Sequence, residues 1–142
     1  MTASKALSLC NCFAVRQAAR QVTRLYERHF AAARLTSAQF SILVALREEA
    51  RLTMLELAKA LVMDRTTLLR AMKPLQRADL VRSTASDADP RQLLFSLSPA
   101  GERKLKQALP LWAKAQEEFE AGMGSREAAR LRSALLALAK DG

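Results

Sequence analysis

Apolar side chains recur at helical spacing along most of the chain, and the first long stretch in which they do so covers residues 7–33. No Pro or Gly interrupts this stretch, and its apolar positions lie among Ala and Arg, which is typical of an amphipathic helix. We therefore predict one long helix here, although the pattern does not define its start. The apolar positions are Leu9, Phe13, Val22, Leu25, Tyr26 and Phe30.

Two capping boxes predict where the next two helices begin. Thr36 and Gln39 have the spacing at which a threonine side chain accepts from the glutamine amide and the glutamine side chain reaches back. Thr53 and Glu56 repeat that spacing. Each box is followed by apolar residues at helical intervals, so we expect both helices to bury one face.

Asp64 predicts the start of a fourth helix, because a carboxylate at the N-cap accepts amide hydrogen bonds and complements the helix dipole. Residues 65–67 would form its exposed first turn. Pro74 cannot donate a hydrogen bond to the carbonyl of Arg70, so we expect a kinked or loosened last turn and an end near residues 78–79.

The hydrophobic period then changes to that of strands. Residues 80–84 predict a short strand, residues 85–91 have turn chemistry, and residues 93–97 predict a return strand. The return strand would place Leu93, Phe95 and Leu97 on one side. The pattern therefore predicts a β-hairpin with an exposed tip.

The rest of the chain is predicted to be helical. Ser98 followed by Pro99 predicts a helix that runs to about Ala121, with a kink at Pro110. Ser125 is expected to cap a final helix with an apolar stripe. The fold class is therefore mainly α with a small β-hairpin. The stripe consists of Leu131, Leu135 and Leu138.

Composition limits the class of protein. The chain has 142 residues, of which half are hydrophobic and 26% charged, so we expect one globular domain, and no apolar run approaches the roughly 18 residues that cross a bilayer. The N-terminus lacks the pattern of a signal peptide, so we expect a cytoplasmic protein with no membrane partner. The two cysteines, Cys10 and Cys12, are too close to join distant segments.

The charge balance favours a polyanionic partner. There are 23 basic and 14 acidic residues, a formal net charge of +9. Much of this excess lies in residues 1–34 rather than in the helices between residues 53 and 79. Arginines recur there at every fourth position and share a helix face, which is either a solvated surface or a contact for DNA phosphates or an anionic small molecule. They are Arg16, Arg20, Arg24 and Arg28.

The order of elements matches a winged helix-turn-helix, in which a helix enters the major groove of DNA and a second element grips the backbone or minor groove. We expect the arginines of the fourth helix to contact guanine or phosphate, and its threonines to contact phosphate or a thymine methyl. The lysine of this helix is expected to anchor a phosphate. The hairpin arginine is expected to enter a minor groove. The candidates are Arg65, Thr66, Thr67, Arg70, Lys73 and Arg91.

Three segments resemble the MarR family of bacterial transcription regulators: LTSAQFSILVALRE, LTMLELAKALVMDRTTLLRAMKPLQRADLV and DPRQLLFSLSPAG. The wing of that family shows Asp-x-Arg, alternating apolar residues and then Leu-Thr-x-x-Gly. Pro90 stands where many members carry another arginine. The matching residues here are Asp89, Arg91, Leu97, Ser98 and Gly101. The resemblance implies that Asp89 stabilises the wing.

The resemblance implies a homodimer whose first and last helices interlock, and two winged domains that read a pseudo-palindromic operator. It also implies repression relieved by a ligand or an oxidant. We accordingly divide the chain into a dimerisation helix (1–34), a winged domain (35–97) and C-terminal dimerisation helices (98–142). A nonspecific nucleic-acid or protein-interaction module is the broader alternative.

Cys12 and Tyr26 resemble the N-terminal helix of the organic-hydroperoxide-sensing members, in which tyrosines hold an oxidisable thiolate. Arg16 could supply positive charge beside Cys12, but Arg16 and Ser37 stand where further tyrosines are expected. The competing interpretation of Cys12 is a buried, inert side chain. We do not expect a bridge to Cys10, because residues two apart in a helix point to different faces.

Catalysis is not expected. His29 and Cys12 lie on one predicted helix about 25 Å apart at 1.5 Å rise per residue, so they cannot form a dyad within a subunit. His29 is expected at a helix surface or dimer interface. No cluster has metal-ligand spacing, and no cofactor motif occurs. If a small molecule controls the protein, we expect its pocket between the winged domain and the dimerisation helices, where Arg16 and Arg20 favour an anionic aromatic effector.

Overall fold

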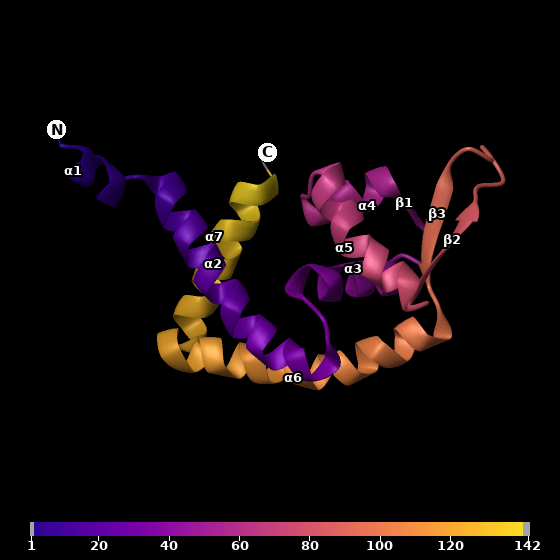
Figure 1. The fold of residues 1–142 in the computed structure, drawn as a ribbon. Coiled ribbons are helices and arrows are strands. Elements are labelled where there is room, and N and C mark those ends of the chain that lie inside the picture. Colours follow the sequence, from indigo (N-terminus) through magenta and orange to yellow (C-terminus); the bar gives the residue numbers. More distant parts are fainter. Residues whose placement is uncertain (1, 141–142) are drawn as a thin grey trace.

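The computed structural model describes residues 2–140 and is predominantly helical (Figure 1). The long helix α6 joins a winged region, made of α3, α4, α5 and a small sheet, to a helical region made of α2 and α7. The elements are α1 (Ala3–Ser8), α2 (Asn11–Phe30), the 3-10 turn η1 (Ala31–Ala33), α3 (Ser37–Glu48), β1 (Leu52–Thr53), α4 (Met54–Leu61), α5 (Arg65–Arg77), β2 (Val81–Ala85), β3 (Leu93–Leu97), α6 (Pro99–Met123) and α7 (Ser125–Lys140).

The predicted single helix over residues 7–33 is wrong at both ends. The chain breaks between α1 and α2, where Cys10 adopts extended backbone angles and its Sγ accepts a hydrogen bond from the amide of Phe13 at 3.3 Å. A cysteine therefore caps α2, a role that apolar spacing cannot reveal. At the other end α2 stops at Phe30, and Arg34 takes a left-handed conformation that turns the chain into the winged region.

The local capping predictions are confirmed. Thr36 and Gln39 form both hydrogen bonds of a capping box at the start of α3, and Thr53 and Glu56 do so at the start of α4. Asp64 accepts from the amide of Thr67 and caps α5. The interactions span only three residues each, so neighbouring side chains suffice to specify them.

The hairpin is confirmed and belongs to a larger sheet. Strands β2 and β3 pair antiparallel, and β1, which we did not predict, adds to the other edge of β3 in the order β1-β3-β2. Strand β2 starts at Val81, one residue later than expected. Of the three apolar residues expected on one side of β3, Phe95 is buried, Leu97 is half-buried and Leu93 is exposed.

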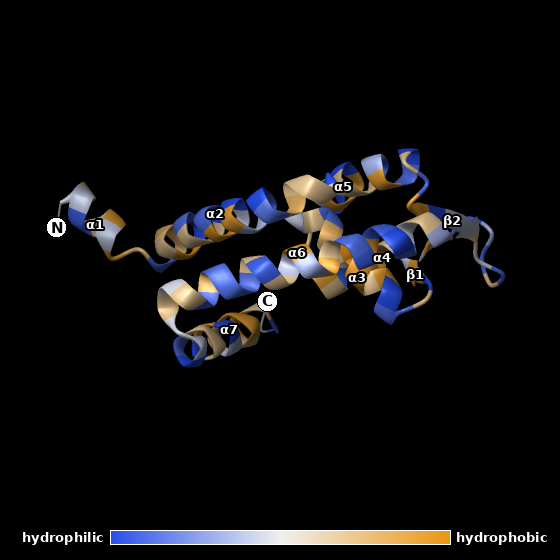
Figure 2. Ribbon diagram, turned by 90° about the horizontal axis from the view of Figure 1, so that it is seen from below, coloured by the Kyte–Doolittle hydropathy of each residue, from blue (hydrophilic) through white to orange (hydrophobic). Residues whose placement is uncertain are grey.

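Helix α6 ends slightly later than predicted, and α7 begins without the predicted cap. Helix α6 continues through Pro110 to Met123, and Ser125 lies inside α7 instead of capping it, because Gly124 makes the turn with φ 94°. Leucines on α7 remain exposed in the single chain, and Figure 2 shows hydrophobic positions along this helix. They are Leu131, Leu135, Leu136 and Leu138.

The core fills the space enclosed by the winged region and the first half of α6. Leu43 of α3, Leu57 of α4, Leu68 of α5 and Leu105 of α6 are almost fully buried in one cluster. This core holds α5 rigidly beside the sheet. Among the described residues, no helix combines the length and the hydropathy that crossing a bilayer requires.

Candidate nucleic-acid interface

Helix α5 presents one polar and one buried face. Leu68, Met72 and Leu75 are buried against the core, which turns the opposite face to solvent. All five candidate residues of α5 are exposed. A helix with a fixed core face and a basic, polar outer face has the form that fits a major groove. These five residues are Arg65, Thr66, Thr67, Arg70 and Lys73.

The first turn of α5 is held by Asp64. The Thr67 hydroxyl donates to Asp64 Oδ1, and the Thr67 amide donates to Asp64 Oδ2 at 3.1 Å. These hydrogen bonds from Thr67 hold the pKa of the Asp64 carboxyl below its ordinary value. The Thr67 hydroxyl is thus already engaged, although both Thr66 and Thr67 are exposed.

The tip of the wing is organised by Asp89. Its Oδ1 accepts from the Arg91 amide at 3.0 Å and from Arg91 Nε at 3.3 Å, and its carbonyl accepts from the Gln92 amide at 2.9 Å. The Arg91 side chain is nevertheless 93% exposed. Asp89 therefore steadies the turn and restrains the base of the arginine while the guanidinium projects into solvent.

The base of the wing is tied to the end of α5 by a compact set of hydrogen bonds. The Ser98 hydroxyl donates to the Asp79 carbonyl and accepts from the Gly101 amide at 3.0 Å. The Ser98 amide donates to the Leu80 carbonyl, also at 3.0 Å. Arg82 of β2 pairs with the Asp79 carboxylate at 3.0 Å. The wing cannot turn about its base without breaking these contacts.

The wing and the leading end of α5 face a common groove, which we call the wing groove. Its lining includes Arg65 from α5, Asp89 and Arg91 from the tip, and the apolar side chains of Leu55 and Leu93. Arg65 and Arg91 lie far apart in the sequence, and only the fold brings them to one surface. Two guanidinium groups at one groove suit a phosphate backbone.

A second cavity, here called the helix cleft, lies where α2, α3 and α6 meet. It has a volume of about 290 Å³ and is lined by aromatic rings and hydroxyl groups. The Ser37 hydroxyl is buried there with no hydrogen-bond partner among the described residues. The cleft lies between the winged region and the long helices, where we expect a ligand pocket, and its lining residues come from three helices. Its lining consists of Val22, Thr23, Tyr26, Phe30, Ser37, Phe40, Ser41 and Trp112.

Arg16 and Arg20 do not line the helix cleft. They lie on the exposed first half of α2, before the helix reaches the winged region. Within the single chain, these arginines therefore do not supply charge to this cleft. The cleft offers hydroxyl groups and aromatic surface instead.

Cys12 and Tyr26 also lie apart. They are fourteen residues apart on α2, which corresponds to about 21 Å along the helix. Tyr26 donates its hydroxyl hydrogen bond to Gln116 Oε1 of α6, and burial, together with Glu120, raises the pKa of its phenol. Cys12 is exposed, so the interpretation of it as a buried side chain is wrong for the single chain.

Helix α2 is bound to α6 at the junction of the two regions. Arg28 pairs with Glu118 Oε1 at 2.7 Å, and His29 Nε2 lies 2.6 Å from Glu118 Oε2. His29 thus lies at a helix surface, where it links two helices. Among residues 2–140, no group of three His, Cys, Asp or Glu side chains could hold a metal ion.

Comparison with known proteins agrees with this geometry. The MarR family model matches residues 35–93. The HTH-type transcriptional repressor NicR from Pseudomonas putida is 29% identical over 126 residues, which cover 89% of this chain and 78% of NicR. The M. tuberculosis transcriptional regulator MOSR, solved in complex with DNA, is 36% identical with a TM-score of 0.82, and the match covers 93% of this chain and 95% of MOSR.

A variant of MarR itself from E. coli, solved with operator DNA, is 25% identical with a TM-score of 0.78, over 87% of this chain and 89% of that protein. The three-stranded wing, the exposed basic face of α5 and the similarity to these regulators over most of the chain lead to one assignment. The chain belongs to the MarR family of DNA-binding transcription regulators.

Proposed function

We propose that the protein is a cytoplasmic homodimeric repressor that binds a pseudo-palindromic operator and leaves it when a small molecule binds. The observation that carries this proposal is the wing groove, where the leading end of α5 and the wing tip present Arg65 and Arg91 on one surface. In a two-fold dimer this surface occurs twice, which suits two operator half-sites.

The DNA contacts divide into two kinds. Arg70 and the side chains of Thr66 and Thr67 lie on the exposed face of α5 and are proposed to read base edges in the major groove. Arg65 and Lys73 are proposed to bind phosphates. Arg91, exposed at the tip and restrained at its base by Asp89, is proposed to enter the minor groove.

Selection of bound genomic fragments with the purified protein tests the operator. We expect recovery of a two-fold symmetric sequence, and competition at fixed salt should favour it over random DNA by about a thousandfold or more. A protein that bound operator and random DNA equally would be a nonspecific nucleic-acid module, because phosphate contacts give affinity without preference.

The helix cleft is proposed to receive the effector. It lies at the junction between the winged and helical regions, so a bound molecule could alter the angle between them. Its hydroxyl groups and rings suit a small aromatic compound with polar substituents, and anionic aromatics remain candidates through hydrogen bonds rather than through Arg16. The unpartnered Ser37 hydroxyl is a ready donor.

Trp112 provides the test of this effector site, since it is the single tryptophan of the chain and lines the cleft. Titration with phenolic acids should change its fluorescence and weaken operator binding in the same concentration range. A Phe40→Ala variant should lose both responses, whereas exposed Leu109→Ala should retain them. Release from DNA without a fluorescence change would place the effector elsewhere.

A thiol switch is the second candidate, and the exposure of Cys12 favours it. An organic hydroperoxide would oxidise the Cys12 thiolate to a sulfenic acid and leave as the alcohol. The nearby Cys10 is not helical, so the argument that two residues of one helix cannot meet does not apply to this pair. Its thiol could condense with the sulfenic acid and release water.

The two switches are separable. If peroxide releases the protein from operator DNA and Cys12→Ser abolishes that release, the thiol switch operates. If Cys12→Ser is still released by peroxide, or if the wild type is not released at all, the thiol switch does not operate. Cys10→Ser distinguishes a sulfenic acid that suffices for release from a disulfide that is required.

A further inference from the structure

Tyr26 belongs to the lining of two separate cavities. One is the helix cleft, of about 290 Å³, and the other is a cavity of about 240 Å³ where α2, α6 and α7 meet, which we call the junction cavity. The junction cavity is also lined by Gln116 and Phe119 from α6 and by Leu131 and Arg132 from α7. Among the described residues, Tyr26 is the one that the two linings share, so its side chain stands between the two spaces.

The ring of Tyr26 is held by contacts on both sides. Its centroid lies 6.4 Å from that of the Phe30 ring, which stacks in turn on Phe40 at 4.6 Å, and both phenylalanines line the helix cleft. Toward the junction cavity, the Tyr26 hydroxyl donates to Gln116 Oε1. Burial and then the nearby Glu120 raise the pKa of this phenol, so it keeps its proton and remains a donor at neutral pH.

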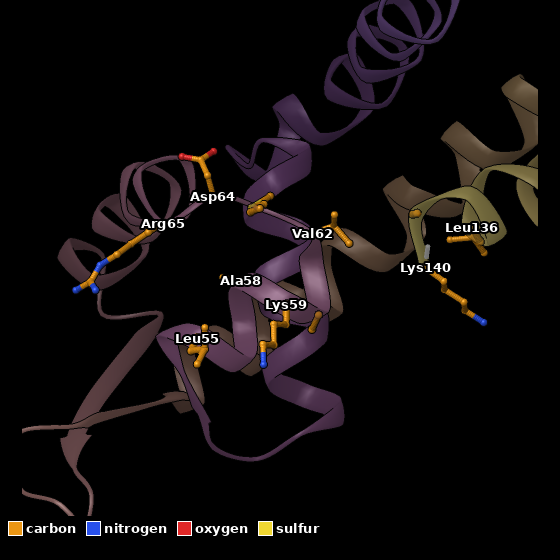
Figure 3. A pocket seen from close by; sticks show the side chains of 11 residues that line it. Leu55, Ala58, Lys59, Val62, Asp64, Arg65, Leu136 and Lys140 are labelled. Carbon is orange, nitrogen blue, oxygen red and sulfur yellow. The ribbon is translucent and has the colours of Figure 1, made fainter. Parts of the chain in front are cut away.

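The junction cavity has a second neighbour, the large open cavity between α4 and the end of α7 (Figure 3). Leu136 lines both of these. It is 58% exposed, and Figure 3 shows Leu136 and Val62 on opposite sides of the open cavity. Leu136 therefore lies at an edge that is open to solvent, whereas Tyr26 is half-buried between the helix cleft and the junction cavity.

The volume of the helix cleft limits the size of compound that fits beside Tyr26. A cavity of about 290 Å³ is at the lower end of the range for small-molecule pockets and has room for one substituted aromatic ring. The junction cavity would add nearly as much space again, but the side chain of Tyr26 separates it from the cleft. A compound with two linked rings therefore needs this side chain to move.

We propose that Tyr26 is a gate, which limits the effector to compounds with a single aromatic ring by closing the helix cleft toward the junction cavity. This inference rests on the proposed effector site and names the residue that sets its specificity. The hydrogen bond to Gln116 keeps the gate closed. When the gate is open, one ring of a two-ring compound occupies the helix cleft and the other ring occupies the junction cavity.

Removal of the gate tests the proposal. The probes are para-hydroxybenzoate, which has one ring, and a para-substituted hydroxybiphenyl carboxylate, which has two, and calorimetry measures the affinity of the full chain for each. Tyr26→Ala should bind the two-ring probe more tightly than wild type does, by about tenfold or more, and the one-ring probe more weakly. Val22→Ala is the matched control and should gain no affinity for the two-ring probe, because Val22 lines the helix cleft but not the junction cavity.

The hydrogen bond provides a second test, which does not depend on whether Tyr26→Ala folds. Tyr26→Phe and Gln116→Leu each remove the hydrogen bond that holds the ring and leave the aromatic wall in place. Each should raise the affinity for the two-ring probe by a few-fold. The double variant should gain no more than either single variant, because all three lack the same interaction. Gains that add, or no gain in either single variant, would overturn the gate.

The outcomes separate failure of the gate from failure of the effector site. If para-hydroxybenzoate binds wild type and changes the fluorescence of Trp112, but no variant of Tyr26 or Gln116 gains affinity for the two-ring probe, only the gate is wrong. The gate is also wrong if wild type binds both probes equally tightly. If neither probe binds wild type or any variant, the effector site and the gate are both wrong.

Discussion

Gly101 lies so close to Leu80 that a methyl group at this position would approach the Leu80 carbonyl oxygen to 2.1 Å. The same carbonyl accepts the Ser98 amide, so the first turn of α6 and the base of the wing meet where only glycine fits. This contact explains why Ser98 and Gly101 occur together at the end of the hairpin. They anchor the wing to the end of α5.

Gly101→Ala should therefore destabilise the winged region. The added methyl group must displace backbone rather than a flexible side chain, and we expect the free energy of unfolding to fall by about 2 kcal/mol or more. Gly122→Ala is the matched control, because nothing lies within 4 Å of its Cβ position and alanine favours the helix by up to about 1 kcal/mol. Denaturant unfolding of both variants checks the prediction. Equal stability of the two would contradict it.

Arg91→Ala should weaken DNA binding to all sequences by a similar factor and lower the salt dependence by about one counterion. Arg91→Lys, which keeps the charge, should retain that dependence. Fluorescence anisotropy over a series of salt concentrations measures both. Arg70→Ala should instead change the preference between operator variants. If the two alanine variants lose affinity equally on every sequence, the proposed division between a sequence-independent contact by Arg91 and base contacts by Arg70 is wrong.

Asp89→Ala should reduce operator affinity less than Arg91→Ala does, because it leaves the guanidinium charge of Arg91 in place while it removes the restraint on that side chain. We expect a loss of a few-fold. The double variant should bind like Arg91→Ala alone. Additive losses would show that Asp89 acts independently of Arg91.

Asp64→Ala should weaken operator binding by loosening the first turn of α5, whereas Asp64→Asn should keep that turn, because asparagine caps helices as well as aspartate does. Thermal unfolding separates the two effects. The alanine variant should melt at a lower temperature than wild type, and the asparagine variant at nearly the same temperature. A lower melting temperature for both would mean that charge, rather than capping, matters here.

The stability of the protein should depend on pH through Glu118, at pH values below the ordinary pKa of a glutamate carboxyl. The hydrogen bond from His29 and the charge of Arg28 lower the pKa of this carboxyl in the folded chain from 4.5. The unfolded chain therefore takes up the proton first as pH falls. The stabilisation is present above about pH 4.5 and is lost as pH falls through the lower folded pKa.

Melting temperatures of wild type and Glu118→Gln between pH 3 and pH 7 check this. The difference between the two proteins should be largest at neutral pH and shrink in acid. Glu117→Gln, at an exposed neighbouring position, is the control. A constant difference across the range would show that the ion pairs with Arg28 and His29 do not contribute.

The sequence by itself determined the elements whose cause is local. A capping box needs only two side chains three residues apart, so Thr36, Thr53 and Asp64 marked three helix starts correctly. The alternation in residues 93–97 likewise marked β3. Resemblance to the MarR family supplied the order of these elements and the expected use of α5 and the wing.

Tertiary structure decided whatever depends on distant residues. Strand β1 exists because Leu52 pairs with Phe95, and two residues alone carry no strand pattern. Arg65 and Arg91 share a groove, and the helix cleft draws its lining from three helices. Hydrophobic spacing also did not predict the break at Cys10 or the left-handed conformation of Val62. Such spacing shows which residues can be buried, and it does not show which partners bury them.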